Sequence, residues 1–281
     1  GGVAELYDLG TDGDSYWLVM RRYTCSLKAW ADGAPSGANG APTLSGASSK
    51  RRDLSEVLQA YDATLSAVAA LHARGVCHFD LKADNFLCDG AKAVGAGGAT
   101  GLPRVVVADF GVATLQRPTA GANAPGGRTP RDRGTESIKS PEMLLIANAP
   151  SGGASGSRPG SAPPISSSPS ACDVWSAGCL LYELITGHHL FGGEDWSSFY
   201  VRLTTETMPL LPPTKMEALP PAHAHALAAF LTTVLQRDPS RRPTIHQVRR
   251  HASKLRATVA ATIAAGAEAH ADGTATAPPT A

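Results

Sequence analysis

The sequence predicts an α+β fold, in which a pair of strands comes first and long helices make up most of the remaining chain. Residues 3–10 and 16–20 are strand-like, because they are rich in apolar residues and flank a turn that contains Asp12 and Gly13. Residues 54–74 carry apolar side chains at the three- and four-residue spacing of an amphipathic helix. Residues 173–187 are apolar on every face, so we expect them to form a helix that is buried on all sides.

Local signals indicate where these elements begin and end. Asp53 followed by Glu56 resembles a capping box at the start of the first helix, and Gly75 stands where that helix should stop. Gly187 is placed in the same way after the buried helix. Three further segments complete the prediction: a β-branched strand at 105–108 and two helices near 223–236 and 244–257.

Composition excludes several classes of protein. The 281 residues carry a formal net charge of +1 with an isoelectric point near 7.9, so no overall field attracts nucleic acid or an anionic membrane. The five cysteines are scattered and form no CxxC pair, which argues against a disulfide framework or a zinc site. They favour a reducing compartment, the cytoplasm or the nucleus. No apolar run approaches the length of about 18 residues that a membrane span needs.

Four stretches are rich in Gly, Ala, Pro and Ser and short of large apolar side chains: residues 33–50, 90–101, 117–130 and 147–170. Such segments cannot bury enough apolar surface to offset the entropy of ordering, so we expect mobile insertions at the surface. The Ala- and Thr-rich tail at 258–281 is expected to be disordered beyond its first turns. The sequence therefore predicts one folded domain over residues 1–257.

One short segment combines polar and apolar residues in an unusual way. Residues 78–87 read HFDLKADNFL, and a buried strand would not tolerate so many polar groups without partners. We interpret the segment as a loop that apolar side chains hold in place while its polar groups face a cleft. Asp80, Lys82 and Asn85 follow the spacing D-x-K-x-x-N, and Asp109 begins an Asp-Phe-Gly turn 29 residues after Asp80.

These residues carry a resemblance to the eukaryotic protein kinases of the serine/threonine type. Five motifs occur in the family's order over residues 3–256: HFDLKADN for the catalytic loop, DFG, GTESIKSPE (134–142) for the end of the activation segment, DVWSAG and RDPSRRPT. The resemblance implies a protein-kinase-like fold with a mainly helical C-lobe at 27–257. It also implies a hinge at 21–26 and a remnant of the N-lobe sheet at 1–20.

The resemblance also implies roles for five residues near the phosphates. Asp80 would accept or orient the hydroxyl of a protein substrate, and Lys82 would neutralise the γ-phosphoryl group. Asn85 and Asp109 would hold Mg²⁺ through oxygen atoms. Thr135 would form hydrogen bonds near Asp80 and Lys82.

Five more residues would contact the nucleoside of ATP. Met20 would occupy the gatekeeper position, and the Arg21 carbonyl and Tyr23 amide would meet the adenine edge. Ser26 is a candidate for the ribose, and Leu87 would lie beneath the adenine ring. The implied cofactors are thus ATP and Mg²⁺, and the implied partners are proteins with Ser or Thr acceptors.

A supporting set of contacts follows from the same resemblance. His78 and Phe110 would stack with Leu6, which lies in the strand-like segment at 3–10. Asp173 would bind the backbone of the catalytic loop, which gives a buried carboxylate its partners. Glu142 and Arg242 would form a buried ion pair.

The chain departs from the family in two respects. It contains no G-x-G-x-x-G loop, no V-A-I-K lysine and no glutamate of the helix that follows, so we expect this chain alone to bind ATP weakly. In addition, Phe79 replaces the arginine that commonly receives a phosphate from the activation loop. We therefore expect activity not to depend on phosphorylation of that loop, although Thr129 precedes a proline there.

Three functions compete at this point. An active serine/threonine protein kinase is favoured, because Asp80, Lys82, Asn85 and Asp109 are all present. A pseudokinase scaffold or binding module is the alternative, since the glycine loop and its lysine are absent from this chain. A small-molecule kinase of related fold is disfavoured, because the GTESIKSPE segment shapes a surface that binds peptides.

Overall fold

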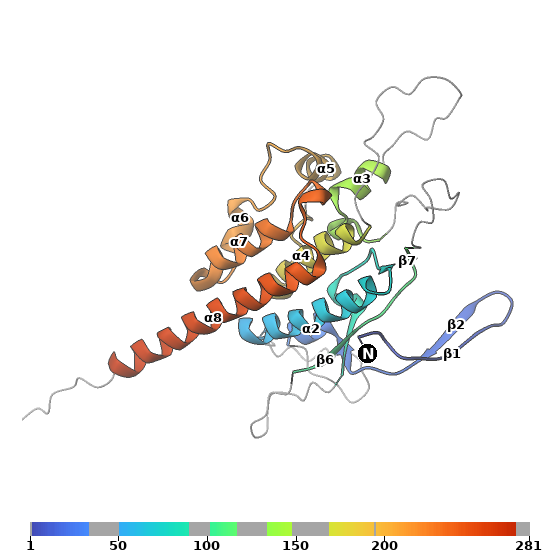
Figure 1. Cartoon of the computed structure of the whole chain (residues 1–281), viewed down its shortest axis with the longest axis horizontal. Helices are drawn as coiled ribbons and strands as arrows, with labels where there is room; N and C mark the ends of the chain where they lie inside the picture. Colours follow the sequence, from blue (N-terminus) through green and yellow to red (C-terminus); the bar gives the residue numbers. More distant parts are fainter. Residues whose placement is uncertain are drawn as a thin grey trace, which may run out of the picture.

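The computed structural model describes residues 2–33, 51–89, 102–116, 134–147, 169–193 and 195–273. The fold is α+β, as predicted, with a small amount of sheet joined to a larger helical part (Figure 1). The four predicted insertions lie almost entirely outside the described residues.

The first two strands form a hairpin. Strand β1 (Leu6–Thr11) pairs antiparallel with β2 (Tyr16–Met20), and Thr11 lies opposite Tyr16 at the turn. Within the turn, Gly13 adopts a φ of +100°, which favours glycine, and Asp12 Oδ1 accepts hydrogen bonds from the backbone of Asp14 and Ser15. The predicted hairpin is therefore confirmed, and apart from Gly10 all its strand residues are exposed.

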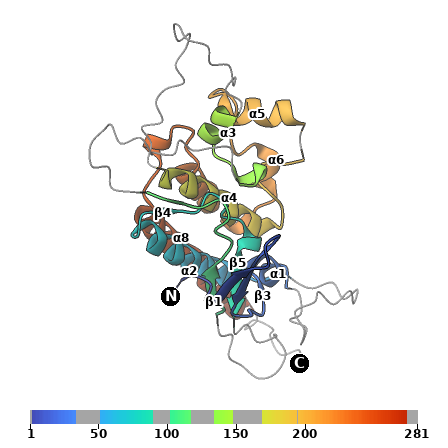
Figure 2. The same cartoon turned by 90° about the vertical axis from the view of Figure 1, so that its right-hand side faces the viewer.

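A second small sheet lies beside the helices. It has the order β3-β5-β6, formed by β3 (Cys25–Ser26), β5 (Phe86–Asp89) and β6 (Arg104–Val107), with antiparallel neighbours. Figure 2 shows β3 and β5 near α1 (Leu27–Ala31). Strand β6 matches the predicted strand at 105–108 except for a shift of one residue. A further pair joins β4 (Val76–Cys77) to β7 (Thr114–Leu115). These two-residue strands were not predicted, because so short a segment carries no periodic signal.

The two main predicted helices are present. Helix α2 (Leu54–His72) begins at a complete capping box, in which Glu56 Oε2 accepts from the Asp53 amide at 3.3 Å. It ends slightly before the expected stop, with Ala73 as its C-cap and Gly75 (φ of +70°) in the turn that follows. Helix α4 (Ser170–Thr186) is buried on every side from Cys172 to Leu184 and ends at Gly187, whose φ is +80°. Burial around the whole circumference explains why α4 shows no polar face.

The C-terminal helix overturns one prediction. Helix α7 (Ala224–Val234) matches the predicted helix at 223–236, but α8 (Ile245–Gly273) runs well past residue 257. Helix α8 packs along α2 and then extends beyond it (Figure 1). The prediction of a disordered tail is therefore wrong for residues 258–273. Low apolar content argued for disorder, yet alanine has the strongest intrinsic helix propensity and buried Val259 still packs on the core.

Short helices complete the described chain: α1 (Leu27–Ala31), α3 (Pro141–Ala147), α5 (Trp196–Thr204), α6 (Pro213–Glu217) and the 3₁₀ turns η1 (Ala83–Asn85), η2 (Glu136–Ile138), η3 (Pro221–His223) and η4 (Pro239–Arg241). None of the helices in the described ranges is both long and apolar enough to cross a membrane.

The helical core is centred on α4. Its Trp175 is fully buried and stacks on Phe191 with ring centroids 5.5 Å apart. The Tyr61 hydroxyl of α2 donates a hydrogen bond to the Ala177 carbonyl at 3.0 Å, so a buried polar group also joins α2 to α4.

The predicted pair of Glu142 and Arg242 is confirmed as a buried, bidentate ion pair. Both nitrogen–oxygen distances are 2.6 Å, and the Arg242 guanidinium also lies 5.1 Å from the Trp175 ring centroid. Burial alone would raise the pKa of Glu142, but the hydrogen bonds and charge of Arg242 outweigh it and lower that pKa below its ordinary value. The pair ties α3 to the segment before α8.

We predict that Glu142→Gln destabilises the protein by about 3–5 kcal/mol at neutral pH, because it leaves the Arg242 charge buried without its partner. Since the pKa of Glu142 is lowered in the folded state, its contribution is present above its ordinary pKa and is lost as pH falls through the lower folded value. Urea unfolding at neutral and acidic pH measures both effects, and the difference between variant and wild type should shrink in acid.

The matched control is Asp62→Asn, which removes the half-exposed pair between Asp62 and Arg256 at 3.6 Å. This variant should lower the free energy of unfolding by less than about 1 kcal/mol. Equal costs for the two variants would contradict the importance given to the buried pair.

Candidate active site

Buried side chains hold the loop at 78–87 in place. Leu81, Ala83 and Phe86 are fully buried, as expected for a loop fixed by apolar residues. The His78 ring is also buried, donates a hydrogen bond from Nε2 to the Ala108 carbonyl at 2.9 Å and meets the Phe110 ring edge-on at 5.1 Å. The predicted contact between His78 and Phe110 is therefore confirmed, with edge-on geometry, whereas the part predicted for Leu6 stays a prediction.

The carboxylate of Asp173 holds the backbone at the start of this loop, as predicted. Its Oδ2 accepts from the His78 amide at 2.9 Å, and its Oδ1 accepts from the Phe79 amide at 2.7 Å. His72 Nε2 lies 2.8 Å from the same Oδ2. These hydrogen bonds hold the backbone at Phe79, which has a φ of +66°. This conformation costs a non-glycine residue about 1–3 kcal/mol.

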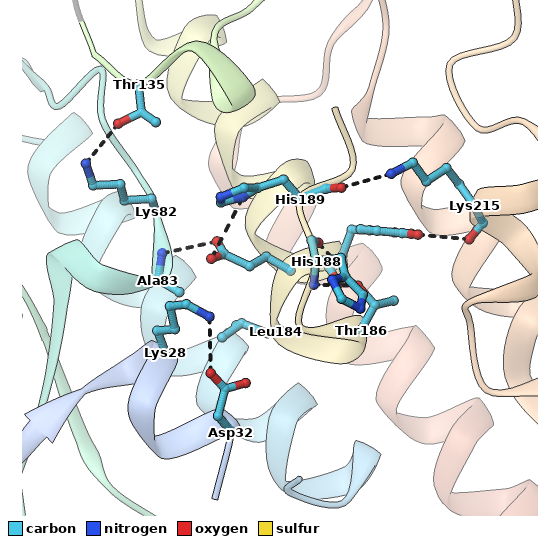
Figure 3. Close-up of polar contacts among 12 residues, drawn as sticks. Lys28, Asp32, Lys82, Ala83, Thr135, Leu184, Thr186, His188, His189 and Lys215 are labelled. Atoms are coloured by element: carbon cyan, nitrogen blue, oxygen red, sulfur yellow. Dashed lines mark hydrogen bonds and ion pairs between the residues drawn. The ribbon is translucent and has the colours of Figure 1, made fainter. Parts of the chain in front are cut away.

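A second buried carboxylate of α4, that of Glu183, also binds the backbone of the loop. Glu183 Oε2 accepts from the Ala83 amide at 3.4 Å, and His189 Nδ1 lies 3.9 Å from Oε1 (Figure 3). Burial raises the pKa of Glu183, which the nearby His189 only partly offsets. Two carboxylates from one helix thus fix the backbone before and after Asp80.

Asp80, Lys82 and Thr135 form a closed set of polar contacts. The Thr135 amide donates to Asp80 Oδ1 at 2.8 Å. Lys82 Nζ donates to Thr135 Oγ1 at 2.8 Å (Figure 3). Lys82 Nζ also lies 3.1 Å from Asp80 Oδ2. The structure therefore brings Thr135 to the position that the resemblance implied, although Thr135 is more than 50 residues away in the sequence.

These contacts determine the charge of Asp80. Burial alone would raise its pKa, but the hydrogen bonds from Thr135, followed by Lys82, outweigh that effect and lower the pKa below its ordinary value. Asp80 is therefore ionised at neutral pH.

Gly134 is required for this approach of the activation segment. It adopts a φ of +79°, and a Cβ at this position would lie only 2.3 Å from the Phe79 carbonyl oxygen. Only glycine lets the backbone before Thr135 pass so close to the catalytic loop.

Asn85 and Asp109 lie at the same end of the β5–β6 pair. Asn85 Nδ2 donates to the Asp80 carbonyl and to Asp80 Oδ2, both at 2.8 Å, which leaves the carboxamide oxygen for a cation. The Ala108 amide donates to the Asn85 carbonyl at 2.8 Å. Asp109, the next residue in the chain and exposed, therefore lies close to Asn85. A carboxamide oxygen and a carboxylate oxygen suit Mg²⁺, which prefers oxygen ligands.

The predicted hinge residues form a second group. Met20 ends β2, and the Arg21 amide bonds to the Glu5 carbonyl at 2.9 Å. The Tyr23 hydroxyl accepts from the Glu5 amide at 3.0 Å. The Arg21 side chain pairs with Asp89 of β5, a contact that sequence reasoning missed because it considered only the Arg21 carbonyl.

Ser26 and Leu87 lie directly opposite one another in the β3–β5 pair. Ser26 is the N-cap of α1, and its hydroxyl oxygen accepts from the Ala29 amide at 3.2 Å. Strand β5 thus joins the two groups, since it starts next to Asn85 and carries Leu87 beside the segment that follows the hinge.

Phe79 takes part in a small apolar cluster. It packs with Cys77, Met143 and Cys172, with Val112 at the edge. Met143 belongs to α3, the helix that ends the predicted activation segment. Sequence reasoning recognised that Phe79 cannot bind a phosphate, but it did not predict that Phe79 contacts the activation segment through apolar packing.

Comparison with known proteins gives a consistent result. A family model described as the protein kinase domain matches residues 3–252. A probable serine/threonine-protein kinase of Dictyostelium discoideum is 34% identical over 87% of this chain, which covers 9% of that protein. The mitochondrial serine/threonine-protein kinase Pink1 of Tribolium castaneum is 26% identical over 81% of this chain, which covers 32% of that protein. The chain thus spans less than a third of the length of these curated relatives.

Among solved structures, the crystal structure of the Rad53 kinase domain and SCD2 has the same fold, with a TM-score of 0.56 and 20% identity. The match covers 89% of this chain and 68% of that chain. The five sequence motifs, the contacts around Asp80 and the extent of the family match agree: the chain belongs to the protein kinase domain family.

Proposed function

We propose that this domain transfers the γ-phosphoryl group of ATP to Ser or Thr hydroxyls of protein substrates. The closed set of contacts among Asp80, Lys82, Asn85 and Thr135 carries the proposal. Phosphoryl transfer depends mostly on positioning and on stabilising charge, and these four side chains are fixed by one another at distances of 2.8–3.1 Å.

Asp80 is proposed to orient the acceptor hydroxyl and to receive its proton. The Thr135 and Lys82 contacts support this role, because they keep the carboxylate ionised in a largely buried position. Asn85 holds the opposite side of the same carboxylate, so the oxygen atoms cannot rotate freely.

Lys82 is proposed to bring positive charge to the transferring group. Its ammonium is shared between Asp80 and Thr135, so it is held at the mouth of the loop and is not fully neutralised by either contact. Through its bonds to Asp80 and Lys82, Thr135 links the activation segment to the acceptor site. We propose that this site accepts a Ser or Thr hydroxyl.

Asn85 and Asp109 would hold Mg²⁺, and Met20, the Arg21 carbonyl, the Tyr23 amide, Ser26 and Leu87 would surround the nucleoside. When bound, Mg·ATP supplies the phosphoryl group and neutralises its charge. The fit rests on the oxygen donors of Asn85 and Asp109 at one end of the β5–β6 pair.

The activation segment is proposed to adopt its working position without a phosphate. Phe79 contacts Met143 through an apolar cluster where the family has a charged phosphate receptor. Apolar packing of this kind is present at all times and needs no modification.

We predict that Asp80→Asn lowers phosphoryl transfer to Ser/Thr peptides by about 100-fold or more, because the amide cannot accept the hydroxyl proton. The measurement is transfer of radiolabelled phosphate from Mg·ATP to a peptide library by the full-length protein. Asp84→Asn is the matched control, since Asp84 is an exposed carboxylate in the same loop. Equal losses in both variants would argue against the proposed role of Asp80.

We predict that Thr135→Val raises the pKa of Asp80 toward its ordinary range, because the hydroxyl contact is the largest factor that lowers it. Carbon NMR titration of labelled aspartate measures the change. Thr135→Ser keeps the hydroxyl and should leave the pKa of Asp80 near the wild-type value. The idea fails if valine and serine give the same titration curve.

We predict that Thr129→Ala keeps most of the activity of the full-length protein, because Phe79 offers no charge to a phosphate at that position. Thr129 lies outside the described residues. Initial rates with the peptide library test this prediction, with Thr119→Ala from the same segment as a control. Loss of most activity only in Thr129→Ala would show that loop phosphorylation is needed after all.

A further inference from the structure

Two of the five cysteines face one another across the sheet that joins the hinge segment to the catalytic loop. Cys25 of β3 is directly opposite Cys88 of β5 in an antiparallel pair, and Ser26 is opposite Leu87 in the same ladder. Residues directly opposite in such a ladder point to the same face, with Cα atoms about 4.5–5.5 Å apart. A disulfide requires a Cα separation of about 4.4–6.8 Å, which the separation of directly opposite residues in such a ladder satisfies.

The two thiols influence one another across the ladder, since each changes the pKa of the other. Cys88 is fully buried between Cys25 on one side and Val105 of β6 on the other. The partner of Cys25 is therefore fixed in place and shielded from other thiols.

We propose that Cys25 and Cys88 form a redox-active dithiol that peroxide converts into a reversible intramolecular disulfide. All five cysteines are free, and Cys25 is half-buried whereas the other four are buried. An oxidant from solution thus reaches Cys25 first.

Electrostatics at Cys25 support the first step. The neighbouring Cys88 thiol, together with the positive charge of Arg52, outweighs the effect of burial and lowers the pKa of Cys25. The lowered pKa favours the thiolate of Cys25, which is the nucleophilic form. The neighbouring Cys25, together with burial, raises the pKa of Cys88, which therefore stays protonated until the second step.

The reaction balances with hydrogen peroxide as the two-electron oxidant. The Cys25 thiolate attacks one peroxide oxygen, the O–O bond breaks, hydroxide leaves and takes up a proton to become water, and Cys25 becomes a sulfenic acid. The Cys88 sulfur then attacks the Cys25 sulfur, the S–O bond breaks, and hydroxide leaves with the Cys88 proton as a second water. Two thiols are oxidised to one disulfide, and one peroxide is reduced to two water molecules.

The disulfide would link the segment after the hinge to the strand after the catalytic loop. It would stand beside Ser26 and Leu87, two of the five residues placed near the nucleoside in the proposed function. Formation of the bond itself does not depend on that function, so the test below can fail or succeed whether or not the domain is a kinase.

The experiment treats the purified protein with hydrogen peroxide, alkylates the remaining thiols under denaturing conditions and maps the peptides by mass spectrometry. Wild type should lose two of its five alkylatable thiols and about 2 Da, with Cys25 linked to Cys88, and dithiothreitol should restore both thiols. Cys77→Ser is the matched control: it removes another buried cysteine near the loop and should keep the Cys25–Cys88 link.

Cys88→Ser should form no link and should instead accumulate a Cys25 sulfenic acid that dimedone traps. The proposal is overturned if wild type keeps five alkylatable thiols, if the map joins other cysteines, or if the disulfide connects two chains through Cys25. The wild-type map decides these outcomes even where a serine variant does not fold.

Discussion

The carboxylate of Asp173 fixes the geometry on which the site depends. Both of its oxygen atoms accept from consecutive backbone amides, at His78 and Phe79, and it sits at the start of a helix that is buried on every side. Phe79 has a left-handed backbone conformation there, which turns the chain so that Asp80 faces the activation segment. Without a buried acceptor for those two amides, the strained turn would have no compensation.

The contacts around Asp80 follow from this fixed turn. Thr135 reaches Asp80 because Gly134 allows close passage beside the Phe79 carbonyl, and Lys82 then contacts both partners. Phe79 serves the same junction from its other side, since its ring packs against Met143 of α3. One residue therefore combines a strained backbone with an apolar contact, and both help to place the activation segment next to the catalytic loop.

Long-range ion pairs hold the more distant parts of the lobe. The Glu142–Arg242 pair joins α3 to the segment before α8, and the Arg242 guanidinium also donates to the carbonyl groups of Gln236 and Ala171. The Arg242 guanidinium also makes a cation–π contact with Trp175 in the centre of the core. Burial of the charge is tolerated because every oxygen and nitrogen of the pair has a partner that matches its geometry.

The sequence by itself determined the fold class, the caps of α2 and α4 and the identity of the polar residues in the loop. These features depend on short-range patterns such as helical periodicity, a capping box and the spacing of Asp80, Lys82 and Asn85. The tertiary structure alone decided the packing of Phe79, the contact between Arg21 and Asp89, the pairing of Cys25 with Cys88 and the length of α8. Each of these joins segments far apart in the chain, or depends on packing against a neighbouring helix, and no local pattern encodes such a contact.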